Sequence, residues 1–298
     1  MHSMNTRSLI SFIIAFGVLF QSSVVFAATA PSQDFFENAW QEAATSTNYS
    51  FSCTVSSSGP KMQSYDSLTS EQKTVVDVTL QTLKRYKSIT KGALVSETKS
   101  LSSTQEKVNT LGILDLMAAG QLTMDQTVKK VKDASKKTIQ VILVGNQTYY
   151  KGNAKWKTFE SPEFAEQVFT SASSNPVNTP LEKSSFAYKN GWKPGSSNAA
   201  VYIGTLTADE TTTLLTPFMG EELAKTKTPL PVKLFITGDG HFKKYEVKSK
   251  TVVGALSFTV KETCTMNFGK AKIKAPAGAT SVDAETGLNE IIELGQLL

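Results

Sequence analysis

The last third of the chain alternates strictly between apolar and polar residues, and this alternation constrains the fold more than any other feature. Between residues 256 and 268 the apolar side chains share one parity, interrupted only by Glu262. They are Leu256, Phe258, Val260, Cys264, Met266 and Phe268. Successive side chains of a strand point to opposite faces. The segment 252–268 therefore predicts one very long or two shorter strands, in an antiparallel sheet with one buried and one wet face.

Further strands are expected along most of the chain, because apolar alternation recurs between turn residues. Gly238-Asp239-Gly240 is a hairpin turn, and Gly145-Asn146 and Gly152-Asn153 separate the strands of a meander. The expected strands are 49–56, 139–144, 148–151, 155–159, 186–189, 200–206, 231–237, 241–248 and 271–274.

Helices are expected where a capping residue precedes an apolar stripe. Ser32 precedes such a stripe over 35–43, and Thr69, Thr123 and Thr207 each begin a capping box. After Thr69 the β-branched run 74–79 also suits a strand, and we favour a helix to about Tyr86. Residues 103–119 carry a further helical stripe, which Gly120 ends.

These elements predict an α+β fold: a curved antiparallel sheet, an incomplete barrel, with helices covering its concave face. The chain has 298 residues, a length that suits one large or two small domains. Because no Pro/Ser-rich linker divides it, we expect residues 28–298 to form a single domain.

The first 27 residues have the three-part layout of a secretory signal peptide. Arg7 ends a polar start, residues 9–20 form an apolar run of twelve, and Val25 and Ala27 stand at the −3 and −1 positions of a cleavage site. Twelve residues are too few to cross a bilayer core, which needs about 20. We expect cleavage after Ala27 and a product that is soluble in the periplasm, the cell envelope or the extracellular space.

Cys53 and Cys264 are the only cysteines. In an exported protein an even count favours one disulfide, which here would join the first strand to one of the last. The alternative is two buried thiols that never meet, and the sequence leaves both open.

The sequence gives no positive case for an enzyme. His2 belongs to the signal peptide, so His241 alone supports neither a histidine metal cluster nor a Ser-His-acid triad. Ser-x-x-Lys occurs four times in one Ser- and Lys-rich stretch, without the companion elements of acyl-enzymes. We therefore expect no catalytic residue, metal or cofactor. Without the signal peptide the chain has 30 basic and 26 acidic residues, a balance too mild to indicate nucleic-acid binding.

The apolar face of the predicted sheet must be covered. If helices cover it completely, its aromatic residues are ordinary core, which is the commoner outcome. If they cover it loosely, a cavity forms that holds a lipid or acyl chain. The candidate ligand-lining residues are Phe51, Tyr202, Phe235, Phe258 and Phe268.

The order of elements resembles the lipoprotein-carrier-like superfamily, the LolA and LppX type of exported bacterial proteins. The resemblance is carried by residues 144–157, 201–210, 231–240 and 273–276, and covers about 33–56 and 138–280. It implies a curved, open half-barrel with helices across its concave side, and carriage of lipids or acylated proteins. The stretch at about 61–137 lies outside it and is expected to be a helical insertion.

We therefore expect an exported, non-enzymatic protein that holds a lipid or another apolar ligand in a half-barrel cavity. Expected partners are a lipid or acylated ligand and, transiently, a membrane surface, but no nucleic acid. The alternative is a cell-envelope interaction or structural protein with a fully packed core and no ligand.

Overall fold

The computed structural model describes residues 30–296 except 109, 153, 173–180, 182, 193–197 and 228. The signal peptide predicted over 1–27 lies outside the described residues. No helix in the described part of the chain has the length and apolarity needed to cross a bilayer.

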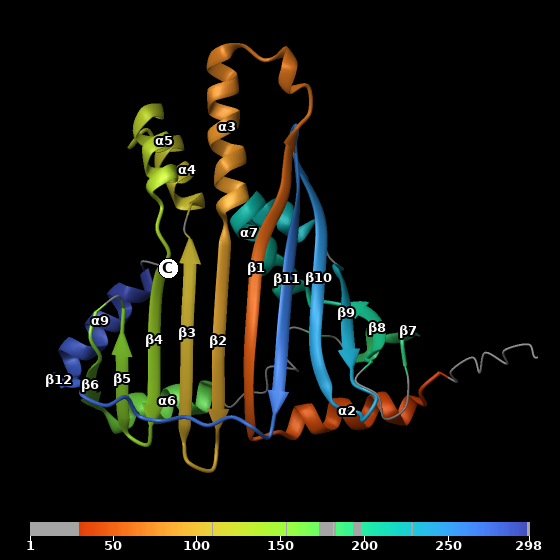
Figure 1. The fold of residues 1–298 in the computed structure, drawn as a ribbon, viewed down its shortest axis with the longest axis vertical. Coiled ribbons are helices and arrows are strands. Elements are labelled where there is room, and N and C mark those ends of the chain that lie inside the picture. Colours follow the sequence, from red (N-terminus) through yellow and green to blue (C-terminus); the bar gives the residue numbers. More distant parts are fainter. Residues whose placement is uncertain are drawn as a thin grey trace, which may run out of the picture.

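The strands form one sheet in the order β12-β6-β5-β4-β3-β2-β1-β11-β10-β9-β8-β7 (Figure 1). All described pairings are antiparallel except β12 with β6. The strands are β1 (Asn48–Met62), β2 (Lys87–Val95), β3 (Ser100–Val108), β4 (Lys137–Val144), β5 (Gln147–Lys151), β6 (Lys157–Glu160), β7 (Ala187–Asn190), β8 (Ala200–Thr205), β9 (Pro231–Ile236), β10 (Phe242–Val253), β11 (Leu256–Phe268) and β12 (Thr280–Ser281). The sheet is curved and does not close into a barrel, which confirms the predicted fold class.

The helices precede, connect or follow these strands. They are α2 (Gln33–Thr45), η1 (Tyr65–Ser67), α3 (Ser70–Arg85), α4 (Leu111–Ala118), α5 (Met124–Asp133), α6 (Pro162–Ala172), η2 (Lys183–Ser185), α7 (Ala208–Met219), α8 (Glu221–Lys225) and α9 (Ala284–Gln296). Ser32 caps α2, and the capping boxes that begin at Thr69 and Thr123 open α3 and α5 as predicted. Thr207 likewise caps α7.

Two meanders make up the sheet, and the pairing of β1 with β11 joins them. Strands β1 to β6 follow one another in space as in sequence, and so do β7 to β11. At the join Cys53 lies opposite Cys264, and a disulfide links the two side chains. Of the two alternatives that the sequence left open, the structure therefore shows the disulfide and not two separate thiols.

Helices cover the two ends of one face of the sheet. On one side Phe36 of α2 lies 4.7 Å from Tyr202 of β8, and Phe218 of α7 lies 5.9 Å from Phe258 of β11, between ring centroids. On the other side α6 packs against Phe159 of β6, which α9 also contacts. The largest core lies under α2 and α7.

Helices α3, α4 and α5 form a cap that projects past the ends of β2, β3 and β4 (Figure 1). Arg85 is the last residue of α3. Its guanidinium donates one hydrogen bond to the carbonyl of Lys132 in α5, at 2.9 Å, and another to the carbonyl of Ala134, the residue after α5, at 2.7 Å. Thr110 is fully buried and donates to the Thr82 carbonyl at 2.9 Å. These hydrogen bonds therefore hold the three helices of the cap together at the base of α3.

The expected helix over 103–119 is wrong in its first part. Residues Ser100–Val108 form β3, and a helix begins only at Leu111. Ser and Thr are weak helix formers, and hydrogen bonding to β2 and β4 on both sides decides the conformation of 100–108. Together β2 and β3 place part of the stretch 61–137 in the middle of the sheet.

Loss of the disulfide should destabilise the fold strongly. The bridge closes a loop with a sequence separation of 211 residues, and long loops gain most from cross-linking. We expect the double variant Cys53→Ala/Cys264→Ala to lose about 2–5 kcal/mol of unfolding free energy, measured by urea denaturation. Chemical reduction of the wild type should give the same loss, and a change below about 1 kcal/mol in both would contradict the account.

Candidate functional site

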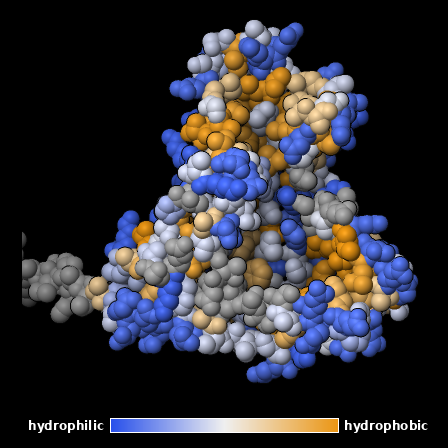
Figure 2. Space-filling view, turned by 180° about the vertical axis from the view of Figure 1, so that it is seen from behind, coloured by the Kyte–Doolittle hydropathy of each residue, from blue (hydrophilic) through white to orange (hydrophobic). Residues whose placement is uncertain are grey.

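The middle of the helix-bearing face, over β1 to β4, is only partly covered. We call this region the central floor, and Figure 2 shows the molecule from the side of this face, with one upper lobe and two lower ones. Its members are all half-buried: Phe51, Cys53, Val55, Ser88, Thr90, Ser103, Gln105, Lys107 and Val141.

Strand register places these residues in three rows across the floor. In the first row Phe51 lies opposite Gly92, Gly92 opposite Ser103, and Ser103 opposite Val141. The second row runs from Cys53 through Thr90 and Gln105 to Ile139. The third row runs from Val55 through Ser88 and Lys107 to Lys137.

Each row therefore begins apolar on β1 and is small or polar on β2 and β3. In the first two rows it becomes apolar again on β4. The centre of the floor is amphipathic as a result.

In the first row the Phe51 ring lies over Gly92 of β2, which has no side chain. A Cβ atom on Gly92 would lie 2.4 Å from that ring. Lys107 brings a cation to the polar strip, and burial lowers the pKa of its ammonium group. This strip can hydrogen-bond a polar headgroup while its flanks contact hydrocarbon.

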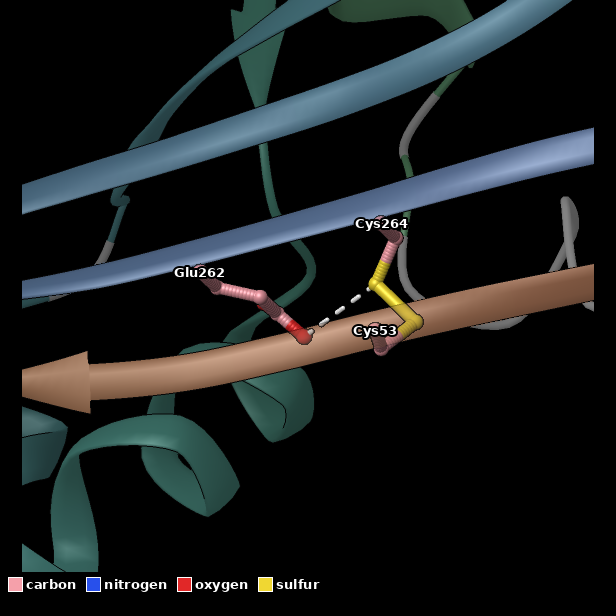
Figure 3. Close-up of side chains that lie close together, drawn as sticks. All are labelled: Cys53, Glu262 and Cys264. Atoms are coloured by element: carbon pink, nitrogen blue, oxygen red, sulfur yellow. Dashed lines mark hydrogen bonds between the residues drawn. A yellow bond between two sulfur atoms is a disulfide. The ribbon is translucent and has the colours of Figure 1, made fainter. Parts of the chain in front are cut away.

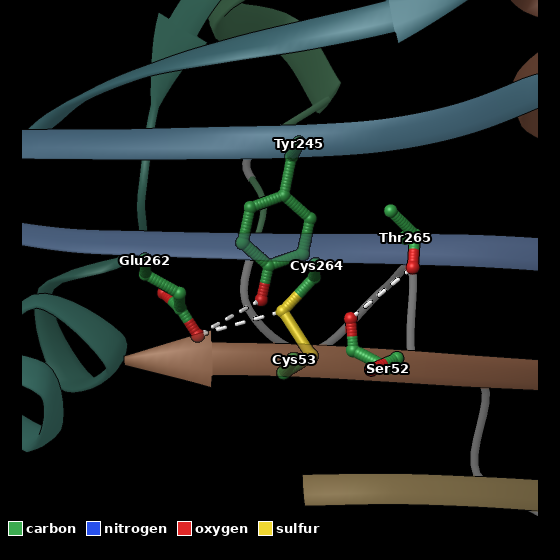
Figure 4. Close-up of a disulfide and its surroundings, with 6 residues drawn as sticks. All are labelled: Ser52, Cys53, Tyr245, Glu262, Cys264 and Thr265. Atoms are coloured by element: carbon green, nitrogen blue, oxygen red, sulfur yellow. Dashed lines mark hydrogen bonds between the residues drawn. A yellow bond between two sulfur atoms is a disulfide. The ribbon is translucent and has the colours of Figure 1, made fainter. Parts of the chain in front are cut away.

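Glu262 lies in the same face, next to the floor on β11 (Figure 3). The side chain is 5% exposed. The Tyr245 hydroxyl donates to Oε1 at 3.4 Å, while Oε2 has no hydrogen-bond partner among the described residues. Cys264 Sγ lies 3.5 Å from Oε1 (Figure 4). A disulfide sulfur has no proton to donate, so this last contact does not satisfy the carboxylate.

These surroundings favour a protonated Glu262. Burial, with a second contribution from the Glu210 carboxylate in the first turn of α7, raises the pKa of Glu262 to about 7, and the Tyr245 hydrogen bond offsets part of this rise. The carboxyl group is thus neutral in mildly acidic solution and charged in alkaline solution. Cys53, Cys264 and Glu262 do not form a metal site, because the disulfide occupies both sulfur atoms.

The five aromatic residues expected to line a cavity are placed differently from one another. Phe51 belongs to the central floor, whereas Tyr202 and Phe258 are each 3% exposed and belong to the core. Phe268 packs against Tyr49 and Phe242, at the edge of a surface pocket of about 650 Å³.

Phe235 lies on the opposite face of the sheet from its neighbour Leu234. Its ring centroid is 4.2 Å from Lys244 Nζ. Phe235 therefore does not share a surface with Phe51.

Several floor residues escaped the sequence analysis. Ser103, Gln105 and Lys107 were assigned to a helix, and Thr90 to no element, because polar strands lack a strong apolar alternation. The interruption at Glu262 was visible in the sequence, but its burial beside Tyr245 depends on the pairing of β10 with β11.

Comparison with known proteins finds similarity in solved structures only. No protein-family model and no curated protein matches the chain. It is similar to LprF from Mycobacterium bovis, with 10% identity, a TM-score of 0.41, and coverage of 84% of this chain and 100% of that one.

Two further solved structures are similar over most of the chain. An uncharacterized conserved protein from Thermus thermophilus has 6% identity and a TM-score of 0.28, covering 84% of this chain and 98% of that one. The hypothetical protein CT021 from Chlamydia trachomatis has 10% identity and a TM-score of 0.24, covering 80% and 97%.

Titration of Glu262 should make stability depend on pH. The unfolded carboxyl loses its proton near pH 4.5 and the folded one near pH 7, so the folded state binds the extra proton between these values. The stability that Glu262 contributes is then fully present below about pH 4.5 and is lost as the pH rises through about 7. We expect Glu262→Gln to gain about 3 kcal/mol relative to the wild type between pH 4.5 and pH 8, measured by urea denaturation.

Glu246→Gln is the matched control on the neighbouring strand. A hydrogen bond from Lys244 lowers the pKa of Glu246, so this variant should keep the wild-type fall of stability between pH 4.5 and pH 8. Parallel pH profiles of wild type and Glu262→Gln would contradict the assignment.

Proposed function

We propose that this protein is an exported, non-enzymatic binding protein that holds an amphiphilic ligand, a lipid or an acylated molecule, over the central floor. One observation carries the proposal: helices cover the two ends of the concave face and leave β1 to β4 half-exposed between them. The predicted signal peptide supports export, and so does the Cys53–Cys264 disulfide, because disulfides persist in oxidising compartments.

The chemistry of the floor specifies the ligand class. Phe51 and Val55 on one flank and Val141 on the other offer apolar surface to acyl chains, worth about 0.8 kcal/mol for each methylene group buried. Ser103 and Gln105 offer hydrogen bonds to a headgroup, and Lys107 a cation, which favours an anionic headgroup. We do not propose that the protein binds nucleic acid.

A second candidate is an exported envelope interaction or structural protein that carries no ligand. The burial of Tyr202 and Phe258 favours it, since half of the sheet has an ordinary packed core. The two candidates differ in whether the central floor binds anything.

Filling the floor should weaken ligand binding. In Ser103→Trp an indole ring would occupy the polar strip and exclude an amphiphile. We expect native mass spectrometry of protein purified from its own host to show copurified lipid on the wild type, and at least about fivefold less on Ser103→Trp, the loss of roughly 1 kcal/mol of binding.

Ser102→Trp is the control, because the adjacent residue of β3 lies on the opposite face and is also half-buried. It should retain wild-type lipid occupancy. Recovery of a ligand-free wild type in repeated preparations, or equal occupancy in both variants, would favour the ligand-free candidate.

A further inference from the structure

Helix α4 in the cap is apolar around most of its circumference and yet is not buried. It reads Leu-Gly-Ile-Leu-Asp-Leu-Met-Ala, and none of its residues is buried. Leu116 is 39% exposed, and Val75 on the neighbouring α3 is 40% exposed. A helix that is hydrophobic all round normally lies inside a protein or a membrane, whereas the side of α4 that carries Leu116 has no cover in the isolated chain.

Basic residues lie beside this exposed apolar surface. Ile113 and Leu116 of α4 share a groove of about 480 Å³ with residues of α5 and of the segment that follows it. The groove is also lined by Lys129, Lys130 and Lys137, against one acidic residue, Asp133. We call Ile113, Leu116, Lys129, Lys130 and Lys137 the cap face.

The groove is a fixed part of the structure. Val131 of α5 is 1% exposed and Thr127 is fully buried, so one side of α5 packs inward. Lys129 and Lys130 of the same helix are exposed. The upper lobe in Figure 2 shows apolar surface bordered by hydrophilic surface, in agreement with this division.

We propose that the cap face docks on the surface of an anionic lipid bilayer. Apolar helix residues flanked by lysines suit the boundary between acyl chains and negative headgroups. The cap projects beyond the end of the sheet (Figure 1), so a flat surface can reach it. The proposal goes beyond ligand binding, since the half-buried members of the central floor lie outside the cap face, and only Lys137, at the β4 end of the third row, adjoins both.

Vesicle binding tests this proposal without reference to any ligand of the floor. We expect the full mature chain to cosediment with vesicles of phosphatidylcholine containing 30 mol% phosphatidylglycerol, and much less with pure phosphatidylcholine. Raising the salt from about 0.1 to about 0.5 M should weaken binding, because salt screens exposed charges.

Two variants identify the surface. Lys129→Ala/Lys130→Ala should bind the anionic vesicles about tenfold more weakly than the wild type. In Leu116→Trp the new indole emission should shift to the blue on the same vesicles, as the ring leaves water. Both substitutions alter exposed side chains, so the fold should persist, and a melting curve checks this.

Lys270→Ala/Lys272→Ala is the control, because it removes the same charge from two exposed lysines that follow β11. It should bind as the wild type does. Equal loss in both lysine pairs, absence of binding to anionic vesicles, or binding only to a protein partner would overturn the proposal. Loss of vesicle binding with retained lipid on the floor would refute the docking surface alone.

Discussion

The pairing of β1 with β11 is the contact on which the rest of the structure depends. Each strand ends a separate meander, and their antiparallel register from Tyr49 opposite Phe268 to Met62 opposite Leu256 turns the two into one sheet. The disulfide stands within this register, at Cys53 and Cys264. Without this pairing the helices of the two meanders would not lie on one face of a single sheet. The central floor, which lies between those helices, would then not exist.

The join also explains why the floor lies where it does. Helices that follow β8, β6 and β12 cover the two outer parts of the sheet, while β1 to β4 lie between these lobes. The polar residues of β2 and β3 tolerate this partial exposure, which an unbroken apolar face would not. Glu262 stands where the packed core meets the floor, and burial there raises its pKa to about 7, which makes the stability of the fold depend on pH.

Much of the architecture could be predicted from sequence, but the floor could not. The parity of 256–268 predicted a strand with one buried face, and Ser32 and Thr123 predicted helix starts, because alternation and capping are local signals. Ser100–Val108 has no such signal: its polar residues become a strand only through pairing with β2 and β4. Phe51 was identified as a lining candidate, whereas Thr90, Ser103 and Lys107 reach the floor through register, which involves residues far apart in the chain.

Thiol labelling of Ser103→Cys, in the oxidised protein, measures the central claim most directly. The account predicts that a maleimide reacts readily with the introduced thiol in delipidated protein, and that addition of an anionic lipid slows the reaction at least about tenfold. Ser102→Cys, on the other face of the same strand, should react at one rate in both conditions. If the thiol of Ser103→Cys resists labelling without lipid, the floor is filled by the protein itself; if it reacts equally fast with lipid, the floor binds none, and either result contradicts the account.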